Sequence, residues 1–191
     1  MARANKDSAF GLRAIGKVGQ NRDNQGLGEY SITANDTTTI YFQDAVSATA
    51  AGTIHQAAES EAFLVGSLNG VFYTDPNTSK PTWSNYYPGS TNASDTVAFV
   101  ADDPYERFEI QSNKATSHTQ SDVFMNFDIE VTAGDSANYV SKSELKHSTG
   151  TAQIKVTGVS KDIDNSNLGA STVNFVVMIN EHLYNAKNNG I

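Results

Sequence analysis

Apolar residues in this chain come in short groups separated by turn-forming residues, and this pattern limits the fold more than any other feature. Five groups of strand length occur before residue 111: 39–42, 62–65, 70–73, 96–100 and 106–110. Residues 122–131 alternate apolar and polar side chains over ten positions, which is typical of a strand with one buried face. Further strands are expected from Ile154 and from Val173. The chain therefore predicts a mainly β fold of at least seven strands, with a small β-barrel or β-sandwich body.

The residues between these groups give local expectations. Asn69-Gly70 lies between two apolar runs and predicts a tight hairpin over residues 64–74. Residues 74–94 predict a long surface loop with aromatic content. Residues 135–147 have a capping residue and late basic residues but little apolar periodicity, so they predict a short helix or a loop.

The first 28 residues differ from the rest in charge. They contain five Lys or Arg and two Asp, a net charge of +3, whereas the other 163 residues carry eight Lys or Arg and nineteen Asp or Glu, a net charge of −11. Five of these 28 residues are glycine. We therefore divide the chain into an extended N-terminal arm, residues 1–28, and a β body, residues 29–191.

The composition of the arm favours a protein partner. Its cations are sparse and the acidic body would repel DNA or RNA, so we expect no nucleic-acid partner. Apolar residues interleaved with the cations suggest that the arm becomes ordered when it binds a protein surface. The residues expected to bury apolar side chains against the partner are Phe10, Leu12 and Ile15. Those expected to make polar contacts with it are Arg3, Arg13, Lys17 and Arg22.

No group of residues predicts catalysis, and we expect no enzyme activity, metal or cofactor. The absence of cysteine excludes disulfides and thiolate zinc sites. Residues 162–167 begin like a calcium loop, but Asn167 stands where the loop glycine belongs and Val173 where the bidentate Glu belongs. The four histidines lack a partner at metal-binding spacing: His55, His118, His147 and His182.

Two features bear on location. The N-terminus lacks the apolar run of a secretory signal, and the longest apolar stretch, residues 175–179, is five residues long. We therefore expect a soluble intracellular product with no membrane partner.

Aromatic residues gather between positions 70 and 90. Trp83, Tyr86 and Tyr87 are candidates for stacking on sugar rings or for anchoring a protein interface. An equally good explanation of this cluster is that the aromatic side chains cover the end of a barrel.

Several segments resemble head decoration (cement) proteins of tailed bacteriophages, especially phages of aquatic bacteria. The resemblance spans nearly the whole chain and rests on AFGLR at 9–13, GKVG at 16–19, GVFYTD at 70–75, WSNYYPG at 83–89, and GVSKD at 158–162 through INEHLY at 179–184. It implies a small β-barrel or β-sandwich protein on the capsid exterior, often a homotrimer, that bridges subunits of the major capsid protein.

The expected function is accordingly non-enzymatic capsid decoration, in which the arm grips capsid subunits and the protein becomes part of the virion after synthesis in the host cytoplasm. Two alternatives remain open. One is a virion-borne carbohydrate-binding module that uses the aromatic residues of positions 83–87. The other is a tail-tube or head–tail connector protein of similar β content.

Overall fold

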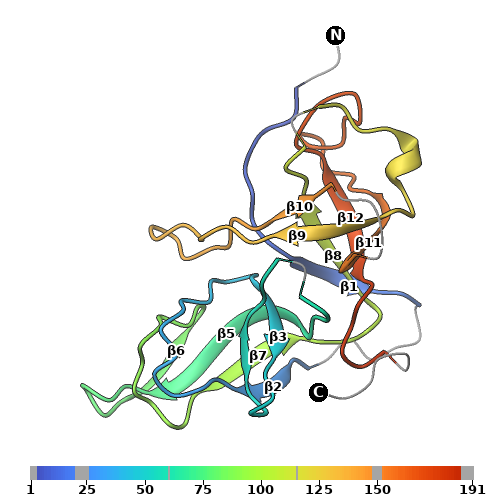
Figure 1. The fold of residues 1–191 in the computed structure, drawn as a ribbon. Coiled ribbons are helices and arrows are strands. Elements are labelled where there is room, and N and C mark those ends of the chain that lie inside the picture. The colour runs from blue at the N-terminus through green and yellow to red at the C-terminus, as the bar shows by residue number, and fades with distance from the viewer. Residues whose placement is uncertain (1–3, 20–25, 60, 115, 148–151, 186–191) are drawn as a thin grey trace.

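The fold was obtained as a computed structural model, which describes residues 4–19, 26–59, 61–114, 116–147 and 152–185. Within these ranges the chain forms twelve strands and one short 3₁₀ helix, so the predicted mainly β fold is confirmed. The strands make two antiparallel sheets, one in each of two lobes that lie end to end (Figure 1).

The first lobe contains the sheet with the order β2-β7-β5-β3-β4, and β6 pairs with β5 beside this path. Its strands are β2 (Gly28–Ser31), β3 (Ala45–Ala48), β4 (Ile54–Gln56), β5 (Gly66–Thr74), β6 (Pro81–Ser84) and β7 (Val97–Ala101). A bridge between Ile32 and Ile54 draws the two edges of the sheet together. The sheet therefore curls round its own core, which includes Val46, Leu68 and Tyr87.

The second lobe contains the sheet with the order β1-β8-β12-β11-β9-β10. Its elements are β1 (Arg13–Lys17), β8 (Glu106–Gln111), η1 (Gln120–Asp122), β9 (Asn126–Glu130), β10 (Glu144–Lys146), β11 (Ile154–Val159) and β12 (Asn174–Ile179). A bridge between Ser112 and Leu145 joins the end of β8 to β10, so this sheet also curls. In the second sheet this bridge reaches β10 from the end of β8 and does not involve the edge strand β1. The described residues therefore form two curled sheets without a closed barrel.

The sequence pattern explains the second-lobe core. On β12 the side chains of Phe175, Val177 and Ile179 alternate inward, as the period-2 pattern predicts, and β8 contributes Phe108 and Ile110. Three residues of the first-lobe part of the chain join the same cluster: Ala45, Ala57 and Leu64. The two lobes therefore share a packed joint.

A long loop strengthens this joint. Residues 131–143 connect β9 to β10 and reach across to the first lobe (Figure 1). There Val140 bridges to Phe42, and the ring of Tyr139 stacks on that of Tyr86 with centroids 3.9 Å apart.

The structure does not show the predicted extended arm over the described residues 4–19. Strand β1 pairs with β8, and Leu12 is 1% exposed within the second-lobe core. Figure 1 shows the chain before β1 running along the side of the second lobe. A boundary at residue 28 therefore does not coincide with the division between the lobes, because the segment before it completes a sheet whose other strands follow residue 105. Periodicity cannot reveal such a distant pairing.

Several local predictions also need correction. The apolar groups at 39–42 and 62–65 form no strands and take part only in isolated bridges. Asn69-Gly70 is no hairpin turn, because β5 runs unbroken from Gly66 to Thr74 with a bulge where the register shifts between Leu68 and Gly70. The expected loop 74–94 contains strand β6. Residues 135–147 form no helix and end in strand β10.

Candidate protein interface

The predicted contacts of the N-terminal segment are made mainly within this chain. Arg13 forms an ion pair with Glu109 and also lies 4.5 Å from the centroid of the Phe10 ring. Lys17 pairs with Asp103 at 3.0 Å between Nζ and Oδ2. These charges are already neutralised in the folded chain.

The three predicted apolar anchors differ in how far they are buried. Leu12 is buried in the core, and its backbone N–H donates to the Gln43 carbonyl at 2.8 Å, so in this structure its side chain packs within its own chain. Phe10 is half-buried, whereas Ile15 is 46% exposed at the bulge of β1. Arg3 and Arg22 lie outside the described residues.

The three candidate aromatics of residues 83–87 are also in different environments. Tyr87 is 1% exposed in the first-lobe core and cannot contact a sugar or a partner. One face of the Tyr86 ring is occupied by Tyr139. Trp83 alone of the three presents a large ring to solvent, with 54% of the residue exposed.

Trp83 belongs to an aromatic surface on the outer side of the first-lobe sheet. In the ladders Phe72 pairs with Trp83 on one side and with Val97 on the other, and Phe99 pairs with Gly70. Directly paired residues project from the same face of a sheet. The rings of Trp83 and Phe99 lie 5.2 Å apart, and Phe72 is 43% exposed. We call the surface formed by Phe72, Trp83, Val97 and Phe99 the aromatic face.

Gly70 makes room for the Trp83 ring. A Cβ atom at position 70 would lie 2.6 Å from Cζ2 of Trp83 and 2.9 Å from the carbonyl oxygen of Ser84. The residue also has φ of 154°, in a bulge that favours glycine. The Asn-Gly dipeptide that resembled a turn therefore shapes the aromatic face.

Acidic groups lie beside this face. Glu29 on β2 pairs with Phe99, so its side chain projects from the same side of the sheet. Asp95 accepts from the backbone N–H of Thr74, and hydrogen bonds from Thr74 lower the pKa of this carboxyl. A partner that covers the aromatic rings would meet negative charge beside them.

A second arrangement has the hydrogen-bond pattern of a hydrolytic triad. The Oγ of Ser112 lies 2.9 Å from Nε2 of His118, and Nδ1 of His118 lies 2.8 Å from Oδ2 of Asp122. Burial lowers the pKa of His118. Burial alone would raise the pKa of Asp122, but hydrogen bonds from His118 and Thr119 outweigh it and lower that pKa.

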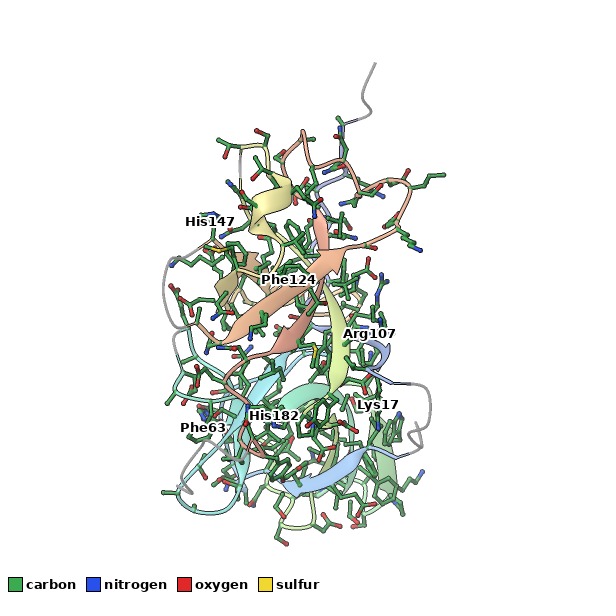
Figure 2. The ribbon with its side chains drawn as sticks, turned by 90° about the vertical axis from the view of Figure 1, so that its right-hand side faces the viewer. Lys17, Phe63, Arg107, Phe124, His147 and His182 are labelled. Carbon is green, nitrogen blue, oxygen red and sulfur yellow. The ribbon has the colours of Figure 1, made fainter. Side chains whose placement is uncertain are left out.

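We call the hydrogen-bonded residues Ser112, His118 and Asp122 the relay. Their burial indicates a structural role. Ser112 is 1% exposed and His118 is 3% exposed, so a substrate carbonyl has no approach to the serine oxygen in this structure. The relay fixes the turn that follows η1. At that turn Phe124 has φ of 74° and is 76% exposed (Figure 2). The serine and aspartate of the relay gave no recognisable sequence signal, because their spacing about His118 matches no motif.

A cavity of about 450 Å³ lies between the N-terminal segment and the β9–β10 loop. Glu144 lines it together with Asp7, Asp135 and Lys142. Burial, followed by the charges of Asp7 and Glu130, raises the pKa of Glu144 to about 7. The cavity therefore holds a carboxyl group that titrates near neutral pH.

Among the described residues, no group of three or more His, Cys, Asp or Glu side chains is arranged to hold a metal ion. No helix in those ranges has the length and apolar character needed to cross a membrane. No family model, curated protein or solved structure matches the chain.

Proposed function

We propose that this protein is a non-enzymatic head decoration protein of a tailed bacteriophage. It binds the outer surface of the capsid, bridges subunits of the major capsid protein and stabilises the head. The proposal is supported by the sequence segments that resemble this family and by a β-rich body with a packed joint between its lobes.

The aromatic face is the observation that carries the proposal. It presents Phe72 and Trp83 on a regular sheet, and aromatic side chains on a rigid support are typical of the energetic centre of a protein interface. The face consists of four residues, whereas a standard interface has about 20–30 residues on each partner, so a contact made through the face alone is weak. A lattice with many copies compensates through multivalency.

The remaining parts of the proposal follow from charge and from the sequence resemblance. The net charge of −8 opposes binding to the packaged nucleic acid and suits a location on the exterior of the virion. The major capsid protein is the proposed partner, and the proposed assembly is a homotrimer.

Binding to capsids of the phage that encodes this chain tests the proposal. Capsids stripped of the protein are incubated with wild type, with Trp83→Ser and with Phe72→Ser, and occupancy is measured after sedimentation. Each variant should bind about tenfold more weakly, because it removes an exposed aromatic anchor.

Ile163→Ser is the matched control. Ile163 is 82% exposed in a turn of the second lobe, so this change also removes an exposed apolar side chain, and occupancy should stay at the wild-type level. Wild-type occupancy for both aromatic variants would reject the aromatic face as the capsid contact. Failure of the wild-type protein to bind would reject capsid decoration itself.

Trp83 also supports a second candidate function, carbohydrate binding. Its exposed ring is a suitable platform for a sugar, although Tyr87 and one face of Tyr86 are unavailable. A glycan array compares wild type with Trp83→Ala. Binding by wild type that is lost in the variant supports this function, and equal or absent binding by both removes it.

A further inference from the structure

The N-terminal residues 5–8 are held by side-chain amides of the second lobe. The Lys6 carbonyl accepts from Asn165 Nδ2 at 2.7 Å and from Gln111 Nε2 at 3.0 Å. The backbone N–H of Lys6 donates to Asn165 Oδ1 at 3.3 Å, and that of Ser8 donates to Gln111 Oε1 at 2.8 Å. These two side chains therefore bind a short stretch of peptide backbone as both donors and acceptors.

The amides are built into the lobe. Gln111, Asn165 and Asn174 are each at least 96% buried, and Oδ1 of Asn174 accepts from both of the other two. We call these three residues the amide cradle. Buried amides that lose their partners are costly, so the cradle needs an extended backbone in place.

The cradle binds backbone and leaves side chains in solvent. Lys6, Asp7 and Ser8 are all exposed, and residues 5–8 belong to no strand. Further along, the segment adds β1 to the outer edge of the second-lobe sheet beside β8. A segment at an edge can be replaced by an identical one without changing the order of the other strands.

The connection from β1 to the first lobe has spare length. Lys17 pairs with Glu106 and Gly28 pairs with Val100, so its two ends attach to positions six residues apart in the chain. Ten residues, 18–27, join these ends, and they reach about 33 Å when extended. The same connection is long enough to lead toward a neighbouring molecule.

We propose that the amide cradle and the edge of β8 opposite β12 bind residues 5–17 of a second copy of this chain in place of the chain's own segment, so that neighbouring molecules are joined by exchange of their N-terminal segments. The observed occupant identifies the partner, because the site already holds this sequence. Closed and exchanged forms make the same contacts within each site, and exchange of an identical element is a low-cost route to an oligomer.

The balance between the two forms depends on concentration. The closed form competes with an effective concentration in the millimolar range, the usual value for two sites joined by a short linker. Exchange should therefore be minor in dilute solution and substantial at about 1 mM, a density of copies that a crowded surface provides. The inference concerns contacts between copies and does not depend on what the aromatic face binds.

Cross-linking in this cysteine-free chain tests the exchange. Arg13 and Glu109 are direct partners across the β1–β8 ladder, so cysteines at these positions are adjacent only where β1 occupies β8. The single variants Arg13→Cys and Glu109→Cys are mixed in denaturant, refolded together at about 1 mM and oxidised. Mass spectrometry then measures disulfide-linked pairs of chains, whose fraction should fall steeply on dilution to about 10 μM.

Two controls decide between the outcomes. Lys155 and Met178 are partners within the second lobe, so a mixture of Lys155→Cys and Met178→Cys gives the background of random linkage. The double variant Arg13→Cys/Glu109→Cys at low concentration should link within one chain, which shows that the geometry permits the bond. Linked pairs well above background establish exchange, and pairs at the background level at 1 mM, with efficient linkage in the double variant, overturn it.

Discussion

The two lobes use similar curled sheets in opposite ways. The first lobe leaves apolar rings exposed on the outer side of its sheet, where Phe72 and Trp83 contact solvent. The second lobe places a buried polar network, the amide cradle, beneath its own N-terminal segment. One surface is apolar and open, whereas the other is polar and occupied. The comparison indicates that the N-terminal segment belongs to the fold of the second lobe, whereas the proposed capsid contact lies on the first lobe.

Removing the side chain that anchors the N-terminal segment should have the largest effect on this arrangement. Leu12→Ala creates a cavity in the second-lobe core and should lower the free energy of unfolding by about 3 kcal/mol. Denaturant unfolding measures it. Ile15→Ala, in the same strand but exposed, should change stability by less than about 0.5 kcal/mol. Equal, small effects of the two changes would mean that the segment is not part of the core.

A smaller loss is expected from a change under the aromatic face. Gly70→Ala forces the new Cβ against Trp83 and Ser84 and should lower the free energy of unfolding by about 2 kcal/mol. Gly52→Ala controls for backbone strain, because Gly52 has φ of 77° and nothing within 4 Å of a new Cβ, and it should cost about 1 kcal/mol. The intrinsic fluorescence of Trp83 should shift only in Gly70→Ala. If both variants lose the same stability and neither shifts the spectrum, the ring does not pack on this strand.

The smallest effect concerns pH and the contact of the N-terminal segment with the β9–β10 loop. Burial and the charges of Asp7 and Glu130 raise the pKa of Glu144 to about 7, above its ordinary value of 4.5. As pH rises between these values the unfolded chain loses the proton first, so this group makes the folded state less stable over that window and adds no further change above it.

Glu144→Gln removes this dependence. After allowance for solvent screening of a partly exposed group, the variant should match wild type at pH 5 and exceed its stability by about 1 kcal/mol at pH 8. Thermal unfolding of both proteins at the two pH values measures the difference. A stability difference that is the same at both pH values would contradict the raised pKa.

Local periodicity located some of the strands but not their partners. The alternation of apolar residues correctly located β12, and the pattern over residues 122–131 contains β9. The same reasoning treated Asn69-Gly70 as a turn, because a bulge and a hairpin favour the same residues. The pairing of β1 with β8 joins residues almost a hundred positions apart, and no local pattern contains that information.

The candidate site was predicted only in part. Trp83 was selected for its chemistry and is exposed, whereas the adjacent Tyr87 is core, since composition does not tell which face of a segment is buried. Phe72 and Phe99 join Trp83 only through the ladders of β5 with β6 and β7. The cations of the N-terminal segment suggested an external partner, although Arg13 and Lys17 find their acidic partners within the chain.

Hydrogen–deuterium exchange of the free and the capsid-bound protein tests the central claim most directly, because it reports on both lobes in one measurement. The account predicts that residues 8–17 are protected in both states, and that protection rises on binding in residues 69–84 and 97–99. The contrary result is a segment 8–17 that exchanges freely in the isolated protein and becomes protected on the capsid, with no change at the aromatic face.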